Sequence, residues 1–182
     1  MATPAATPLA ATRRRWLVAG VAAAATATGA TLAWMQRSSR ADADPSAPLW
    51  DMEFDTLGPQ KLAMRQFAGR PLILNFWATW CPPCIEEFPL LDAFYRQNSP
   101  NGWQVVGLAV DQATAVEKFL QQNPVQFSIA LAGIQGMELS RSLGNLAGGL
   151  PFTVAFNAKL QPMQRKMGRL SLQDLQTWAA IP

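Results

Sequence analysis

Residues 72–87, LILNFWATWCPPCIEE, contain both cysteines of this 182-residue chain. The run 71–78, PLILNFWA, is almost continuously apolar and dense in β-formers, which predicts a strand buried on both faces. Pro82 and Pro83 suit the first turn of a helix, where missing N–H groups need no partner. The stretch therefore predicts a buried strand followed at once by a helix that begins at the cysteines and ends near Gln97.

The sequence from Trp50 onward alternates short apolar runs with amphipathic stretches, which is typical of an α/β domain with a central sheet. Ile134, Met137, Leu139 and Leu143 fall near one face of a predicted helix. The further elements that we expect are a short hairpin or turn within 50–67, strands at 103–111 and 125–131, helices at 113–122 and 134–145, a hairpin over 152–168, and a final helix from Ser171.

The N-terminal segment has the composition of an export signal or membrane anchor. Residues 16–34 carry no charge and follow three consecutive arginines, and this length is at the lower edge of a membrane-spanning helix. A cleaved signal peptide is the other interpretation, because an A-x-A site lies at 41–43. The run TRRRWLV at 12–18 also resembles the twin-arginine export signal. Both interpretations export the domain and bring the N-terminal segment into contact with a membrane.

We therefore expect three regions along the chain: a signal peptide or anchor over 1–35, a polar linker over 36–49 and one folded domain over 50–182. The formal net charge of +3 is due to the first region, since 44–182 holds ten basic and eleven acidic residues. This balance gives no reason to expect nucleic-acid binding.

The chain contains no histidine. This absence excludes Ser-His-Asp and Cys-His nucleophile activation, histidine-ligated zinc and cysteine-histidine copper sites. Two cysteines also cannot fill a four-ligand zinc or iron–sulfur site within one chain. A redox pair, a two-thiolate metal clip and a structural disulfide remain open, and we expect no metal and no cofactor.

The predicted helix start favours the redox interpretation. Unpaired N–H groups and the helix dipole stabilise a thiolate at the first position, so Cys81 is the candidate nucleophile. Cys84 lies one turn further along and can resolve a mixed disulfide. Glu87, three residues beyond, projects from the same side, and from spacing alone a buried proton shuttle and a solvated surface carboxylate are equally plausible. Glu86 is expected at the surface.

The residues FWATWCPPC, Glu87, Pro89 and a GLPFT stretch some seventy residues downstream resemble the thioredoxin superfamily, in particular the extracytoplasmic TlpA/ResA-like thiol–disulfide oxidoreductases. The resemblance covers about 50–182. It implies a thioredoxin fold, a mixed sheet of four or five strands flanked by helices, with an N-terminal hairpin and a central insertion. Asn75 stands where cytoplasmic thioredoxins carry a buried aspartate.

The resemblance also implies roles for individual residues. Cys81 would attack, Cys84 would resolve, and Glu87 would match the acidic residue that the family keeps beside the motif. Pro151 would be a cis-proline that faces the disulfide, although a trans bond is the ordinary expectation for an X-Pro pair. The remaining substrate-binding candidates are Leu150, through its backbone, and Trp80; we expect Trp77 and Trp80 to cover the site, with at least one of them packed in the core.

By this resemblance the protein is a periplasmic, membrane-tethered enzyme that reduces or exchanges disulfides in client proteins. Its expected partners are those clients, with cytochrome c maturation (apocytochrome c) as one pathway, and a membrane electron donor of the DsbD/CcdA kind. Two alternatives are a chaperone-like or soft-metal-binding module with a non-catalytic CxxC, and a peroxiredoxin-like peroxidase. The peroxidase would need a Thr-x-x-Cys arrangement, whereas Thr79 lies only two residues before Cys81.

Overall fold

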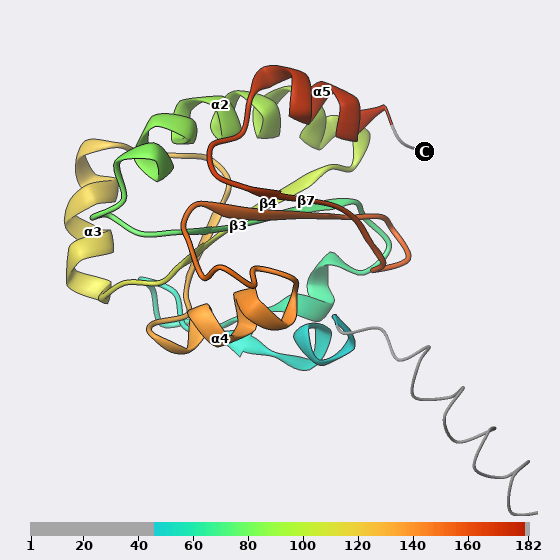
Figure 1. The fold of residues 1–182 in the computed structure, drawn as a ribbon. Helices are drawn as coiled ribbons and strands as arrows, with labels where there is room; N and C mark the ends of the chain where they lie inside the picture. The colour runs from blue at the N-terminus through green and yellow to red at the C-terminus, as the bar shows by residue number, and fades with distance from the viewer. Residues whose placement is uncertain (1–45, 181–182) are drawn as a thin grey trace, which may run out of the picture. The chain divides into compact units, whose positions relative to one another are not determined.

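The computed structural model describes residues 46–180, so the predicted leader and most of the predicted linker lie outside the described part of the chain. A five-stranded sheet in the order β5-β4-β3-β6-β7 forms the centre of this domain (Figure 1). The parallel strands β3, β4 and β5 occupy one half, and β6 and β7 continue the sheet antiparallel to β3. Their bounds are Leu72–Trp77, Gln104–Ala109, Ser128–Leu131, Phe152–Phe156 and Pro162–Met167, from β3 to β7.

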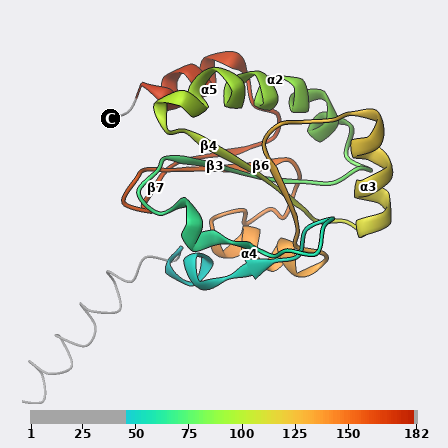
Figure 2. The ribbon, with the colours of Figure 1, turned by 180° about the vertical axis from the view of Figure 1, so that it is seen from behind.

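Helices cover both faces of the sheet (Figures 1 and 2). On one face, α2 (Pro82–Asn98), α3 (Ala113–Gln122) and α5 (Leu172–Ala179) contribute to a core cluster that includes both cysteines. On the other face, α4 (Gln135–Ser142) and the N-terminal hairpin enclose a second cluster. That hairpin pairs β1 (Glu53–Phe54) with β2 (Leu62–Ala63) in antiparallel fashion, as predicted for 50–67.

Three short 3₁₀ helices complete the described elements, at Ala47–Asp51, Met64–Phe67 and Ser99–Asn101. The first of them already contributes to the core, since Leu49 is 1% exposed. Its end lies beside the second, because the carboxylate of Asp51 pairs with Arg65.

Strand β3 lies at the centre of the sheet and all six of its residues are buried, which confirms the prediction from its apolar run. Its neighbour β4 carries Gly107 opposite Asn75. A Cβ at Gly107 would lie 3.2 Å from the indole nitrogen of Trp77 and 2.7 Å from Cδ1 of Ile129. The glycine therefore makes room for the Trp77 side chain across the sheet.

The prediction that Ile134 belongs to the apolar face of α4 is wrong. Ile134, which precedes the helix, is 87% exposed, whereas Leu143 is buried and Met137 and Leu139 pack against the core. The chain turns into α4 through Gly133, whose φ is +54°. This turn directs Ile134 away from the face that the following residues bury.

The terminal helix is capped as the sequence predicts. The Ser171 hydroxyl accepts a hydrogen bond from the Asp174 N–H, and the Asp174 carboxylate accepts one from the Ser171 N–H, which completes a capping box. Between β4 and β6 the chain forms α3, β5 and α4. The thioredoxin fold, with its N-terminal hairpin and mixed five-stranded sheet, is thus confirmed.

Candidate functional site

The two cysteines form a disulfide at the start of α2. Cys81 is the N-cap residue of this helix, and Pro82 and Pro83 occupy its first turn. Cys81 keeps 5% of its surface accessible, while Cys84 is fully buried. A polypeptide that approaches this disulfide can therefore contact part of Cys81 but not Cys84.

The disulfide lies at the edge of the sheet where β3 ends and the antiparallel strand β6 begins. Pro151 immediately precedes β6, and the Leu150–Pro151 peptide bond is cis, which confirms that expectation. Pro151 is buried, and Leu150 is partly buried against the cluster that contains both cysteines. The fold thus brings the CPPC motif and the GLPFT stretch to one edge of the sheet.

Glu87 is buried, with 1% of its surface exposed, so the solvated alternative is wrong. Its Oε1 accepts a hydrogen bond of 2.7 Å from Nδ2 of Asn75, and its Oε2 accepts one of 2.7 Å from the N–H of Leu170. The Asn75 amide also donates to Oγ1 of Thr153, at 3.0 Å. One carboxyl therefore joins α2 to β3 and to the segment that follows β7.

Burial raises the pKa of Glu87 from its ordinary value of 4.5 to about 7, because desolvation of the carboxylate outweighs its stabilising partners. The Leu170 N–H, the Asn75 amide and the positive charges of Arg169 and Lys166 act in the opposite direction. A carboxyl group with a pKa near neutrality can both take up and release a proton, one helical turn from Cys84.

The two tryptophans beside the motif have separate environments. Trp77 is fully buried, and its ring centroid lies 4.3 Å from that of Phe88 and 5.4 Å from that of Phe119. Trp80 is 66% exposed. The expectation that both tryptophans cover the site is therefore wrong for Trp77. This residue is the last of the buried central strand β3, and its side chain packs in the core. Of the two, only Trp80 is exposed at the surface.

The turn between β3 and α2 is attached to the end of β4 by Asp111. One carboxylate oxygen of Asp111 accepts hydrogen bonds from the backbone N–H and from the hydroxyl of Thr79, at 2.8 and 2.6 Å. The Thr79 hydroxyl therefore makes a structural hydrogen bond to the segment that follows β4. These bonds position the backbone that leads into Trp80 and Cys81.

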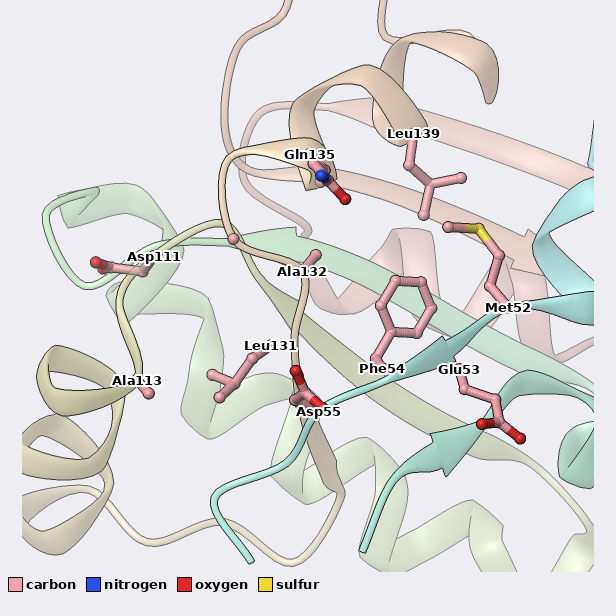
Figure 3. A pocket seen from close by; sticks show the side chains of 12 residues that line it. Met52, Glu53, Phe54, Asp55, Asp111, Ala113, Leu131, Ala132, Gln135 and Leu139 are labelled. Atoms are coloured by element: carbon pink, nitrogen blue, oxygen red, sulfur yellow. The ribbon is translucent and has the colours of Figure 1, made fainter. Parts of the chain in front are cut away.

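Asp111 also lies at the margin of a pocket of about 380 Å³ between the N-terminal hairpin and the start of α4. Figure 3 shows its carboxyl group directed away from Phe54 and Ala132, which line the middle of the pocket. None of the residues predicted for the functional site lines this pocket.

Sequence reasoning did not identify the partners of Glu87. Leu170, which donates to Glu87, and Thr153, which accepts from the Asn75 amide, lie 83 and 66 residues away from this glutamate along the chain, and no local pattern marks either of them. Asn75 stands where thioredoxins carry an aspartate, but that departure does not predict its contact with Glu87. Within residues 46–180, Oδ1 of Asn75 is buried without a hydrogen-bond partner.

Residues 46–180 contain no cluster of three or more histidine, cysteine, aspartate or glutamate side chains that could hold a metal ion. None of the helices in the same range has the length and apolarity needed to cross a membrane. The segment for which an anchor was predicted, 1–35, lies outside that range.

Comparisons with known proteins agree with the fold. The sequence model of the Redoxin family matches residues 42–160. The thiol-disulfide oxidoreductase ResA of Bacillus thuringiensis is 27% identical over 120 residues, which is 65% of this chain and 67% of that protein. ResA of Bacillus subtilis is 34% identical over 86 residues, 47% of each chain.

The fold has close counterparts among solved structures. A thioredoxin-related protein from Neisseria meningitidis serogroup B superposes with a TM-score of 0.63 at 28% identity, over 70% of this chain and 96% of that one. Together with the Redoxin match over more than half of the chain, this likeness establishes the relationship. The chain belongs to the Redoxin family and is a ResA-like thiol–disulfide oxidoreductase of the thioredoxin superfamily.

Proposed function

We propose that this enzyme is exported and membrane-tethered, and that it reduces or exchanges disulfides in client proteins through Cys81 and Cys84. The observation that carries the proposal is the unequal burial of the two cysteines at the start of α2, with 5% exposure for Cys81 and none for Cys84. The leader over 1–35 and the ResA-type relatives support an extracytoplasmic, periplasmic location.

In this proposal the reduced enzyme donates two electrons to a client disulfide, and each client sulfur leaves as a thiolate that takes up a proton from water. The thiolate of Cys81 attacks one client sulfur, and the other client sulfur leaves as a thiolate that takes up a proton. Cys84 then loses its proton to Glu87 and attacks the sulfur of Cys81, which releases the second client sulfur and leaves the enzyme disulfide. The client ends as a dithiol.

The client would lie across the exposed Trp80 and along Leu150 and Pro151. Trp80 offers a large aromatic surface next to the reactive sulfur, and 66% of it is exposed. Apocytochrome c in cytochrome c maturation is one client class, and general disulfide handling is the other. A reducing role requires electrons from a membrane donor of the DsbD/CcdA kind, which would return the enzyme to its dithiol form.

The first experiment measures the midpoint potential of the Cys81–Cys84 pair in the full-length protein, by alkylation after equilibration with dithiol redox buffers. A value below about −220 mV, toward the thioredoxin end of the range, supports a reductant. A value near about −120 mV would mean an oxidant and would overturn the reductive role.

A second experiment tests the division of roles between the sulfurs. The Cys84→Ser variant should accumulate mixed disulfides with a model disulfide peptide, because the attacking thiol is present and the resolving thiol is missing. The Cys81→Ser variant should accumulate few or none, since its remaining thiol is buried. Equal trapping by both variants would reverse or abolish the assignment.

A further inference from the structure

A cavity of about 340 Å³ lies between α2 and the link from β7 to α5. The α2 side is lined by Glu86, Glu87 and Leu90, and the other side by residues 169–172. Glu87 is among the residues that line the cavity, although only 1% of its surface is exposed. A space of this size has room for several water molecules beside Glu87.

The adjacent residues Glu86 and Glu87 of α2 bind Arg169 and Leu170, which are adjacent in the link from β7 to α5. Oε2 of Glu86 lies 2.6 Å from Nη1 of Arg169, and both side chains are 57% exposed. Oε2 of Glu87 accepts the buried hydrogen bond from Leu170. The exposed ion pair therefore lies at the outer rim of the cavity, and the buried bond lies at its inner wall.

We propose that this cavity is the route by which Glu87 exchanges its proton with solvent, and that Arg169, paired with Glu86 at the rim, is a positioning residue for that exchange. The inference rests on the proposed function, in which Glu87 accepts the proton of the Cys84 thiol. After that transfer the carboxyl holds one extra proton. It can return this proton to Cys84 when the disulfide is reduced again or release it to water, and the cavity is a space through which water can approach Glu87.

The charges around Glu87 favour the ionised carboxylate after this release. Arg169 on the link and Lys166 on β7 both act on it with positive charge. Lys166 is itself bonded to Asp174 of α5, and on α2 the neighbouring Glu86 is paired with Arg169. From β3, Asn75 contributes an N–H donor and no charge. Arg169 is thus the charged group at the cavity rim that acts on Glu87.

The first test compares Arg169→Gln and Arg169→Lys in the full-length protein. The readout is the pH dependence of the rate at which a dithiol reduces the Cys81–Cys84 disulfide, with its inflection assigned to Glu87. Loss of the positive charge should move the inflection upward by about 0.5 pH unit, and the lysine variant should keep the original value. The shift should shrink in 1 M salt, because the arginine is exposed.

The matched control is Arg65→Gln, which breaks the exposed ion pair with Asp51 on the opposite face of the sheet. It should leave the inflection unchanged. An Arg169→Gln variant with the wild-type inflection would overturn the role of Arg169.

The second test asks whether small acids reach the carboxyl position through the cavity. Glu87→Ala should slow the pH-dependent step and leave space that formate can enter, so formate should restore the rate. Glu87→Gln should be slowed without rescue, because its side chain still fills the space. A Leu172→Trp substitution at the lining should remove most of the rescue, while Leu57→Trp on the exposed hairpin loop should not.

The outcomes separate this inference from the proposed function. If Glu87→Gln keeps the wild-type pH profile, the proton role of Glu87 fails. If Glu87→Gln removes the inflection, the proton role of Glu87 stands. The cavity route is nevertheless wrong if formate does not restore the rate of Glu87→Ala, or if Leu172→Trp leaves that rescue unchanged. Should Glu87→Ala not fold, Leu172→Trp alone decides: if this variant keeps the wild-type rate of disulfide reduction and the wild-type pH profile, the cavity route is wrong.

Discussion

Glu87 is a carboxyl group in a place where a charge is costly. Two hydrogen bonds, from Asn75 and Leu170, satisfy its oxygens but do not replace the water that burial removes. The pKa of Glu87 therefore rises from 4.5 to about 7. A group of this kind lowers the stability of the folded protein whenever the pH forces it to ionise.

This cost predicts that Glu87→Gln stabilises the oxidised protein at high pH. The unfolded chain ionises Glu87 above pH 4.5 and the folded chain only above about pH 7, so wild-type stability falls as pH rises between these values and then levels off. Glutamine does not ionise. Urea unfolding should show the variant more stable than wild type by up to about 3 kcal/mol at pH 8, and the two nearly equal at pH 4.

The control for this prediction is Glu86→Gln, one residue away on α2. Its exposed ion pair with Arg169 contributes little, so its effect on the free energy of unfolding should be about 0–1 kcal/mol. A Glu87→Gln effect of the same size at pH 4 and pH 8 would contradict the assignment of the pH-dependent stability to this carboxyl.

The connection between β3 and α2 shows how neighbouring elements hold the redox motif. Apolar residues place β3 at the centre of the sheet, and the two prolines start α2 after the four residues 78–81 that follow the strand. Asp111, two residues after the end of β4, accepts hydrogen bonds from both the N–H and the hydroxyl of Thr79. The turn that presents Cys81 is therefore attached to the next parallel strand.

Thr79→Val should destabilise the protein by about 1–2 kcal/mol, because it keeps the shape of threonine but leaves the Asp111 carboxylate without its hydroxyl donor. Thr79→Ser keeps the donor and should retain most of the stability. The checks are urea unfolding and the rate of Cys81 alkylation in the reduced protein. Equal destabilisation by both substitutions would mean that the methyl group, and not the hydrogen bond, is what matters.

Packing across the sheet joins the elements into one domain. Buried clusters on its two faces share the central strands, with Trp77, Phe88 and Phe119 in contact beneath the disulfide. Gly107 lies between these layers of side chains. Its missing Cβ is a requirement of the assembled sheet, because the atoms it would meet belong to β3, β5 and the segment that precedes β5.

Gly107→Ala should therefore cost about 1–3 kcal/mol of stability through overpacking. The matched control is Gly58→Ala in the hairpin loop, where the added Cβ meets only Oγ1 of Thr56 at 3.7 Å. That change should alter the free energy of unfolding by no more than about 0.5 kcal/mol. Similar losses in both variants, measured by urea unfolding, would contradict the packing argument.

Local sequence patterns were sufficient to predict the strand–helix unit around the cysteines, the order of the elements and the capping box at Ser171. Each depends on residues close together in the chain: an apolar run, a proline pair, or a hydroxyl with a carboxylate three residues later. Such patterns act through local backbone geometry and solvation, which is why they can be read without the fold.

The environment of each side chain depended on the assembled fold. Spacing alone does not decide whether Glu87 is buried or solvated, and its burial depends on the link from β7 to α5 that packs against it. The exposure of Ile134 follows from a turn at Gly133 that the apolar pattern does not reveal. Sequence alone thus determined that this chain carries a CPPC motif at a helix start after a buried strand. Tertiary contacts determined which groups surround it, because burial and desolvation are set by residues that are distant in the chain.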